Sequence, residues 1–296
     1  MVRVKIPATT ANMGPGFDVL GMALKLYNYV EIEETDEESK IFINGEESEL
    51  DYKNHLVYKT LTKVLDNFKY KYNGFNINME ECNIPMSRGL GSSAACIVSA
   101  VVSAGKIMNR EFSKEDIINI ATEIEGHPDN VVPATVGGMV ISLMDENKIN
   151  YSKVKVPEEL KFVVMIPSFK VDTEESRDIL PKSYDKKDCI YNISRSSMLI
   201  SSLYNKEYDK LRLSFDDKIH QPYRKKLIQD SEYIFEKSKE FGAIGEFISG
   251  SGSTLISVIH KDEEKFMNSM KDILNNGKKI WNIKLLEPDL EGVQIV

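Results

Sequence analysis

The segment PMSRGLGSSAA, at residues 85–95, places two closely spaced glycines and two serines directly before an apolar run. Glycines let backbone N–H groups approach an anion, and the positive end of a following helix would point at the same anion. The hydroxyls of Ser92 and Ser93 suit phosphate oxygens or a magnesium ion. The residue types therefore fit a phosphate-binding loop, and they fit equally a helix N-cap beside a tight turn.

Two familiar phosphate motifs do not describe this loop. A Walker loop requires a lysine and a hydroxyl residue directly after its last glycine, and that pair is missing here. Gly89, Gly91 and Ala94 satisfy the dinucleotide pattern G-x-G-x-x-A. That pattern should follow directly on a buried strand, whereas Pro85 and Arg88 interrupt the sequence. A phosphate loop of another kind stays open beside the structural interpretation.

The elements before the loop read as strands and one helix. Val2, Val4 and Ile6 alternate with charged residues, which predicts a first strand that ends at Pro7. Apolar residues then recur at helical spacing in residues 51–68, and FNINMEECNIP returns to a strand pattern before the loop. The predicted order is strands, helix, strand, glycine loop.

Two helices are predicted after the loop, over residues 91–108 and 113–126. At 1.5 Å per residue each is roughly 18 to 25 Å long, so the pair should form an antiparallel hairpin. The second helix then returns to the N-terminal end of the first. Glu123 and Glu125, near its C-terminal end, are thereby expected close to the glycine loop.

A new strand pattern, LKFVVMIP, begins near residues 155–160, where we place a domain boundary. The clearest feature beyond it is GEFISGSGSTLISVI, two strand-like runs joined by a Gly-Ser turn. With 296 residues, the chain is long enough for two medium-sized domains.

Charge and cysteine content narrow the function classes. The formal net charge of −8 disfavours nucleic acid or an anionic membrane as the main partner, because both require a concentrated basic face. Cys82, Cys96 and Cys189 show no close pairing, which argues against a disulfide framework or a zinc site. The segment MVRVKIPATTAN shows neither signal peptide nor anchor, so we expect a soluble, cytoplasmic protein.

Four segments together resemble the GHMP small-molecule kinases. Three of them, PATTANMGPGFDVLGMAL, PMSRGLGSSAA and ISGSGST, match the superfamily in order and spacing. The fourth, EGHPDNVVPATVGGM, resembles specifically the homoserine kinase branch. The resemblance implies an α+β, two-domain GHMP kinase fold with the active site between the domains. Residues 1–157 would form an ATP-binding domain of the ribosomal S5 domain-2 type, and residues 158–296 a ferredoxin-like α/β domain.

The resemblance also implies ATP and Mg²⁺ as cofactors. Ser93 and Glu123 would hold the magnesium ion, with Glu125 as the competing ligand. Asn54 would lie near the adenine. The implied phosphate-binding residues are Pro85, Met86, Ser87, Arg88, Gly89, Leu90, Gly91, Ser92, Ser93, Ala94 and Ala95.

The implied acceptor site suits an amino acid that carries one hydroxyl. Asp18 would pair with its ammonium group, and Arg177 and Arg224 would bind its carboxylate in bidentate fashion. Without the resemblance, Asp18 would be interpreted as a loop cap, and Arg177 and Arg224 as surface ion-pair partners. The full implied set is Asn12, Asp18, His127, Asn130, Thr173, Arg177 and Arg224.

The proton acceptor is the least determined part. The resemblance to homoserine kinases implies that no aspartate base lies within reach of the acceptor hydroxyl. Asp129 is the nearest candidate in this sequence. If Asp129 points away, catalysis would rest on positioning and on charge neutralisation by Mg²⁺, the helix terminus and Thr173.

The predicted activity is transfer of the γ-phosphoryl group of ATP to the hydroxyl of L-homoserine, giving O-phospho-L-homoserine and ADP on the way to threonine. The rivals are another GHMP kinase, of the mevalonate or shikimate type, and a non-catalytic metabolite-binding relative. Asp18 separates the substrates, because only an amino acid brings an ammonium group. Family habit suggests a homodimer.

Overall fold

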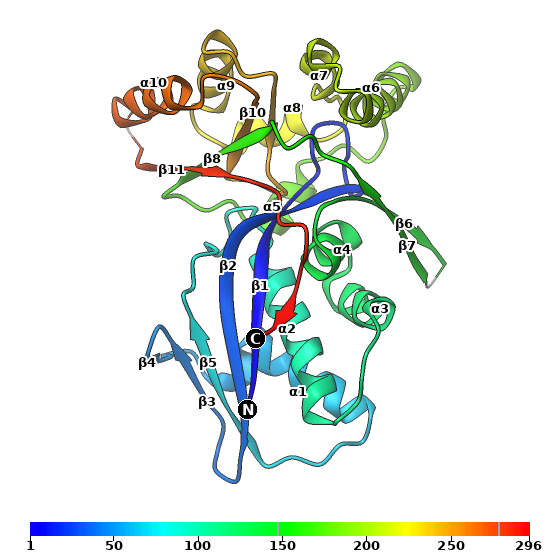
Figure 1. The fold of residues 1–296 in the computed structure, drawn as a ribbon, viewed down its shortest axis with the longest axis vertical. Helices are drawn as coiled ribbons and strands as arrows, with labels where there is room; N and C mark the ends of the chain where they lie inside the picture. Colours follow the sequence, from blue (N-terminus) through cyan, green and yellow to red (C-terminus); the bar gives the residue numbers. More distant parts are fainter. Residues whose placement is uncertain (147, 278) are drawn as a thin grey trace.

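The computed structural model describes residues 1–146, 148–277 and 279–296, which form two sheets with helices packed on them (Figure 1). The larger sheet has the strand order β12-β1-β2-β5-β3-β4, and β6 joins it through β2 and carries β7. Its strands are β1 (Val2–Ala11), β2 (Leu20–Thr35), β3 (Lys40–Ile43), β4 (Glu46–Glu47), β5 (Gly74–Glu80), β6 (Met139–Asp145), β7 (Lys148–Val154) and β12 (Gln294–Ile295).

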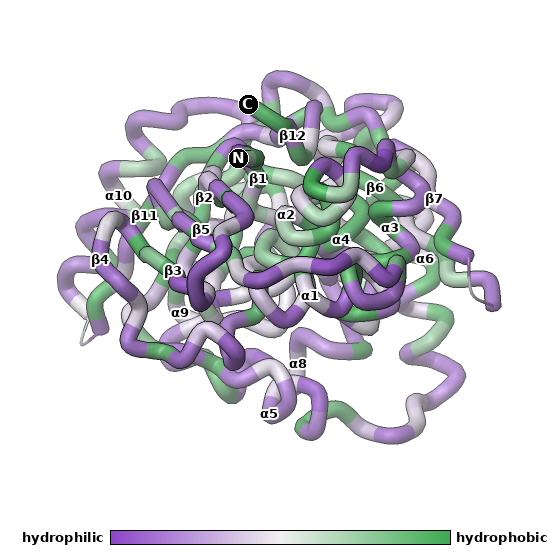
Figure 2. Tube along the Cα trace, turned by 90° about the horizontal axis from the view of Figure 1, so that it is seen from below, coloured by the Kyte–Doolittle hydropathy of each residue, from purple (hydrophilic) through white to green (hydrophobic). Residues whose placement is uncertain are grey.

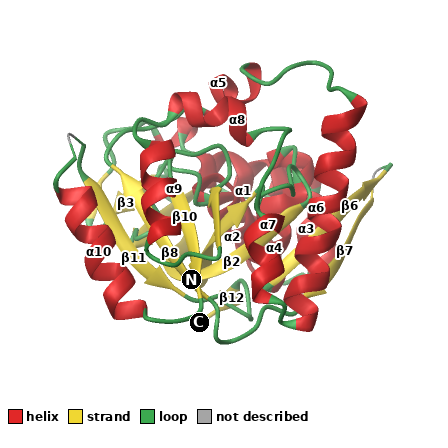
Figure 3. Ribbon diagram, turned by 90° about the horizontal axis from the view of Figure 1, so that it is seen from above, coloured by secondary structure: helices red, strands yellow, loops and turns green. Residues whose placement is uncertain are grey.

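The smaller sheet is antiparallel and has the order β11-β8-β10-β9. Its strands are β8 (Lys161–Pro167), β9 (Gly245–Ile248), β10 (Leu255–Ile259) and β11 (Trp281–Leu286). The predicted hairpin around the Gly-Ser turn is confirmed as β9 and β10. Two helices, α9 (Ser231–Glu240) and α10 (Glu263–Asn275), pack on one side of this sheet (Figure 3).

The other helices lie on the larger sheet or near the junction of the two sheets. On the larger sheet, α2 packs against β1, with α1 and α3 as further neighbours. The bounds are η1 (Tyr52–Asn54), α1 (Leu56–Asn67), α2 (Ser92–Ile107), α3 (Lys114–Glu125), α4 (Pro128–Val136), α5 (Thr173–Asp178), α6 (Lys186–Asn205), α7 (Tyr208–Ser214), α8 (Gln221–Arg224) and η2 (Lys225–Leu227). Within the described ranges, no helix is both long and apolar enough to cross a membrane.

The prediction that the first strand ends at Pro7 is wrong. β1 continues to Ala11, and its register against β2 shifts between Pro7 and Ala8. A bulge of this kind accommodates a residue that has no N–H to offer to the ladder. The longer strand carries the first motif, from Ala8 onward, toward the junction of the two sheets.

The helical hairpin of α2 and α3 is confirmed. Ser113 caps α3 in a reciprocal capping box with Asp116, and Gly126 ends it with a φ of 90°. A third helix follows after only two residues, which the sequence did not indicate: His127 is the N-cap of α4, and Pro128 occupies its first turn. The segment His-Pro-Asp-Asn has the composition of a turn but forms the start of this helix.

The chain leaves the larger sheet after Val154 and enters the smaller one at Lys161, on either side of the boundary expected between residues 157 and 158. The last residues do not stay with the smaller sheet. β12 pairs with β1, and Pro288 bridges to Leu24 in β2, so the C-terminus lies beside the N-terminus (Figures 1 and 2). The apolar segments gather at the centre of the molecule, where one cluster continues from the larger sheet into the smaller (Figure 2).

Gly21 on β2 has no room for a side chain. An added Cβ would overlap the carbonyl oxygen of Asp129 in α4. That carbonyl approaches so closely because residue 133, four positions on, is a proline without an N–H to bind it. β2 and α4 are thereby held in direct contact behind Asp129.

We expect Gly21→Ala to lower the free energy of unfolding by about 1 to 3 kcal/mol, because α4 must shift to admit the methyl group. Gly277→Ala is the matched control, since its Cβ would meet two carbonyl oxygens at ordinary contact distance, Leu274 at 3.4 Å and Ile273 at 4.0 Å. Urea unfolding of both variants and the wild type measures the difference. Equal midpoints for Gly21→Ala and wild type would contradict the packing.

Candidate active site

A cavity of about 410 Å³ lies between elements of both sheets. Residues 86–89 and 91–93 of the glycine loop line it, together with the start of α4. The start of α5 and residues 250–251 line it as well. The segments singled out in the sequence thus meet around one space.

The glycine loop is held by close backbone contacts. Gly89 and Gly91 have φ values of 74° and 68°, which favour glycine. A Cβ on Gly89 would overlap the carbonyl oxygen of Ser249, and one on Gly91 would overlap the hydroxyl of Thr9. Gly91 is also the N-cap of α2, whose N-terminus therefore faces the cavity.

The Gly-Ser turn of residues 248–254 packs against both the glycine loop and the end of β1. Ser249 Oγ lies 2.6 Å from the carbonyl oxygen of Gly89 and 2.8 Å from Thr10 Oγ1. The Gly250 N–H donates to the Ala11 carbonyl at 2.9 Å, and the Thr254 N–H donates to Arg88 at 3.1 Å. These bonds join the two domains directly beside the cavity.

Not every residue of the expected phosphate loop faces the cavity. Leu90, Ala94 and Ala95 are buried beneath the loop in the apolar core, and Pro85 lies outside the cavity lining. The others of that set, Met86, Ser87, Arg88, Gly89, Gly91, Ser92 and Ser93, line it, and so does Asn54.

The Arg88 guanidinium binds protein rather than pointing freely into the cavity. Its Nε donates to the Pro167 carbonyl at 2.9 Å, and its Nη2 donates to the Ser168 carbonyl at 2.6 Å. Burial lowers the pKa of this group from its ordinary value. Arg88 ties the loop to the end of β8, which is a positioning role for the phosphate loop.

The carboxylate that meets Ser93 is Glu125. The Ser93 hydroxyl donates to Glu125 Oε2 at 2.6 Å, and both residues line the cavity. Glu123 is exposed on α3, outside the cavity lining. Burial raises the pKa of Glu125, and the Ser93 bond partly offsets that rise. The geometry thus reverses the expected order of the two glutamates.

Most of the residues expected at the acceptor site line the same cavity. Asn12, His127, Asn130, Thr173, Arg177 and Arg224 all line it. Asn130 Oδ1 accepts from the Thr9 hydroxyl at 2.7 Å, which ties the start of α4 to β1. Thr173 and Arg177, four residues apart, share the short helix α5. Burial lowers the pKa of His127, and the nearby charge of Arg177 lowers it further.

Asp18 lies beside this set and is paired within the protein. Its carboxylate accepts two bonds from Arg177, at 2.9 Å and 3.3 Å. The Asp18 N–H donates to Asn12 Oδ1 at 2.8 Å, so Asn12 also caps its own loop. The two side chains expected at opposite ends of an amino acid, Asp18 and Arg177, thus neutralise each other.

Asp129 lines the cavity with only 3% of its surface exposed. Burial raises its pKa to about 7, and the negative charge of Asp18 adds to the rise. Arg177 acts in the opposite direction. A carboxyl group that titrates near neutrality within a cleft is suited to proton transfer.

One buried residue of the site, His220, was not predicted from the sequence. His220 is fully buried, stacks on Phe17 at 5.4 Å between ring centroids, and lies within 3.4 Å of Arg224. The available signal was its spacing, four residues before Arg224 at the start of a helix. Burial and the charge of Arg224 lower the pKa of His220 to about 4, although Asp217 opposes that change.

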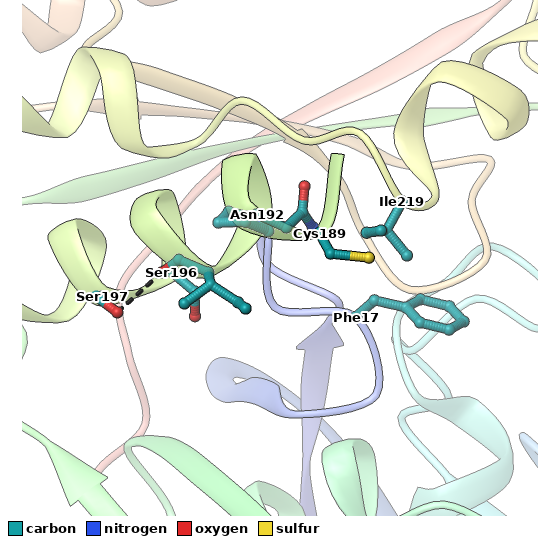
Figure 4. Close-up of a pocket in the computed structure, with 8 residues that line it drawn as sticks. Phe17, Cys189, Asn192, Ser196, Ser197 and Ile219 are labelled. Atoms are coloured by element: carbon teal, nitrogen blue, oxygen red, sulfur yellow. Dashed lines mark hydrogen bonds between the residues drawn. The ribbon is translucent and has the colours of Figure 1, made fainter. Parts of the chain in front are cut away.

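A second cavity of about 410 Å³ lies on the far side of Phe17, between the loop at Pro15 and α6 (Figure 4). Cys189, Asn192 and Ile219 face it in the same view. Asn192 is engaged with Asp217 at 2.6 Å. Phe17 lines this hollow, and its ring lies 5.0 Å from the guanidinium of Arg224, which lines the first cavity.

Comparison with known proteins agrees with this geometry. The GHMP kinases N terminal domain matches residues 55–138, and the GHMP kinases C terminal domain matches residues 203–276. Homoserine kinase of Clostridium kluyveri is 59% identical over 100% of this chain and 98% of its own length. Homoserine kinase of Clostridium acetobutylicum is 53% identical over 100% of both chains.

A solved structure gives the same result for the fold. The crystal structure of homoserine kinase from Cytophaga hutchinsonii superposes with a TM-score of 0.87 at 26% identity, covering 100% of this chain and 97% of that one. The two-domain α+β fold is therefore that of the GHMP kinases. By sequence and by fold, the chain belongs to the homoserine kinase family of the GHMP kinases.

Proposed function

We propose that this protein is an ATP-dependent homoserine kinase, which transfers the γ-phosphoryl group of ATP to the side-chain hydroxyl of L-homoserine. The products are O-phospho-L-homoserine and ADP. One observation carries the proposal: the same cavity is lined by a glycine loop that leads into a helix N-terminus and by side chains of both charge signs. The glycine loop suits a nucleotide phosphate, and the charged side chains suit a zwitterionic amino acid.

As a kinase of this family, the protein uses ATP. The backbone of the glycine loop and the N-terminus of α2 would bind its phosphates. Leu50, Leu56 and Asn54 line the same cavity and would contact the nucleobase. Ser249 and Arg88 hold the loop rigid, so little backbone ordering would accompany binding.

We infer that Mg²⁺ is held by Ser93 and Glu125. The donor set fits this ion, because a hydroxyl and a carboxylate are hard oxygen ligands. Among the described residues, no group of three or more His, Cys, Asp or Glu side chains could hold a metal alone. The remaining ligands would be phosphate oxygens and water, the usual arrangement for magnesium in kinases. When bound, the ion would neutralise charge on the transferred phosphoryl group.

The acceptor end supports an amino acid over a plain hydroxy acid. Arg177 and Arg224 would bind the carboxylate, while Asp18 would offset the ammonium group. A hydroxy acid such as mevalonate or shikimate would add negative charge here with no cation of its own. Thr173 would lie beside the transferred group, opposite the glycine loop.

A reaction without a base would be expected if Asp129 pointed away from the cavity. Asp129 instead lines the cavity. We propose that its carboxylate accepts the proton of the substrate hydroxyl. Asn130 Nδ2 lies 3.3 Å from Asp129 Oδ1 and would help to orient it. Positioning and charge neutralisation would supply the rest of the rate enhancement.

The experiment that tests the activity is a coupled assay of ADP release with ATP and Mg²⁺. We expect L-homoserine to exceed mevalonate, shikimate and 4-hydroxybutyrate by about 100-fold or more in kcat/KM, because only it matches both signs of charge. Faster turnover of another acceptor would assign the site to a different GHMP kinase. Nucleotide binding without any turnover would favour a metabolite-binding relative.

Glu125→Gln and Glu123→Gln form a matched pair on the same helix. We expect Glu125→Gln to lower kcat by about 100-fold or more and to raise the Mg²⁺ concentration needed for half-maximal rate. Glu123→Gln should stay near wild type, because its side chain is exposed. The reverse order would return the metal site to Glu123.

The role of Asp129 predicts a pH dependence with a definite sign. Its pKa in the unliganded protein is raised to about 7, so the fraction of ionised base, and with it kcat/KM, should rise about tenfold per pH unit below pH 7 and level off above. Asp129→Asn should lower kcat by about 100-fold or more and remove this rise.

The same raised pKa affects stability. Between the ordinary value of 3.8 and about 7, the folded state binds more protons at Asp129 than the unfolded state, so stability falls as pH rises through this range. Asp129→Asn should therefore resist urea better than the wild type at pH 8. Retention of most turnover in this variant would show that no base is required.

A further inference from the structure

The imidazole ring of His220 is fully buried and makes two hydrogen bonds. Its Nε2 lies 2.8 Å from the Gly14 carbonyl oxygen. A carbonyl oxygen can only accept, so Nε2 carries the hydrogen. The neutral ring then presents Nδ1 as an acceptor, and Nη1 of Arg224 lies 3.4 Å from it.

Arg224 is almost as deeply buried, with 1% of its surface exposed. Its Nη1 donates to the Gly250 carbonyl at 2.9 Å as well as to His220, and its Nε donates to the Ser176 carbonyl at 3.2 Å. Three of its five N–H groups are thereby used. Within the described residues, no hydrogen bond engages Nη2, and the side chain lines the cavity.

The other bond of His220 reaches the loop that carries the remaining acceptor residues. Gly14 lies between Asn12 and Asp18, and a Cβ on Gly14 would lie 2.8 Å from the Phe215 carbonyl oxygen. Phe17, on the same loop, stacks on the His220 ring and lies 5.0 Å below the Arg224 guanidinium. Figure 4 shows the Phe17 ring projecting from this loop beside Ile219, the residue before His220.

We propose that His220 is a positioning residue for the acceptor: it fixes the guanidinium of Arg224 with Nη2 toward the cavity and ties that group to the loop of Asn12 and Asp18. The inference rests on the proposed function, because it takes Arg224 as the partner of the acceptor's carboxylate. His220 does not touch the substrate. It sets the separation between the groups that bind the two charges of one amino acid.

Two substitutions separate the two bonds. The amide of His220→Asn can place its oxygen where Nδ1 lies, which keeps an acceptor for Arg224 and loses the bond to Gly14. The amide of His220→Gln can reach the position of Nε2, which keeps the bond to Gly14 and leaves Nη1 without this acceptor. We expect His220→Gln to raise the KM for L-homoserine on the order of tenfold and His220→Asn to raise it less. The KM for ATP should change in neither variant.

A second substrate distinguishes positioning from a purely structural role. 3-Aminopropan-1-ol is L-homoserine without its carboxylate, so it makes no use of Arg224. The loss of kcat/KM caused by His220→Gln should therefore be large for L-homoserine and close to absent for 3-aminopropan-1-ol. Equal losses for both substrates, or equal increases in the KM for ATP, would overturn the proposal.

The wild-type protein provides a reading that does not depend on the variants folding. ¹⁵N NMR at neutral pH should show His220 as a neutral ring with hydrogen on Nε2. Hydrogen on Nδ1 would remove the acceptor for Arg224 and would overturn the proposal. If wild-type protein fails to phosphorylate L-homoserine, the proposed function fails instead, and the two failures are told apart by this control.

Discussion

The cavity depends on the contact between the glycine loop of residues 85–95 and the Gly-Ser turn of residues 248–254, where no side chain fits between Gly89 and the Ser249 carbonyl. The Ser249 hydroxyl bonds to both Gly89 and Thr10, which belong to the other domain. Phosphoryl transfer requires donor and acceptor at a fixed separation, since a misplacement of about 1 Å can cost 10²-fold in rate. Loops from the two domains meet here with that separation set by backbone contacts.

Charge at the acceptor end is balanced within the protein itself. Arg177 pairs with Asp18 at 2.9 Å, while Arg224 is held by carbonyl groups and by a neutral histidine. Two buried or half-buried cations are therefore stabilised by different means, one by an anion and one by dipoles. A zwitterion can enter such a site without changing its total charge. An acceptor with a single charge would leave one of these groups unbalanced.

Much of this arrangement follows from the sequence, because it rests on local patterns. Helical spacing predicted α2 and α3, and their antiparallel packing brought Glu125 to Ser93 as hairpin geometry requires. Spacing did not rank Glu123 against Glu125, since both lie on the last turn of α3 and only tertiary packing decides which one faces inward.

Other features depend on contacts between residues that lie far apart in the chain, so no local sequence pattern predicts them. The acceptor of the His220 ring hydrogen is Gly14, more than two hundred positions away in the chain. The start of α4 was missed because His-Pro-Asp-Asn has the composition of a turn, whereas its backbone is fixed by Gly21 on a distant strand. The residue types of the motifs were informative, and their mutual contacts depended on the folded sheet.

Because β12 pairs with β1, the larger sheet cannot be completed until the second domain has been synthesised. Strand β12 covers one edge of β1, and the Val296 N–H donates to the Arg3 carbonyl at 3.0 Å. A polypeptide released after residue 157 would expose that edge as an open template for other strands. The larger sheet can thus be completed only after residues 294–295 are translated. Because residues 3 and 296 are hydrogen-bonded there, a short linker between these positions would yield a circular permutant.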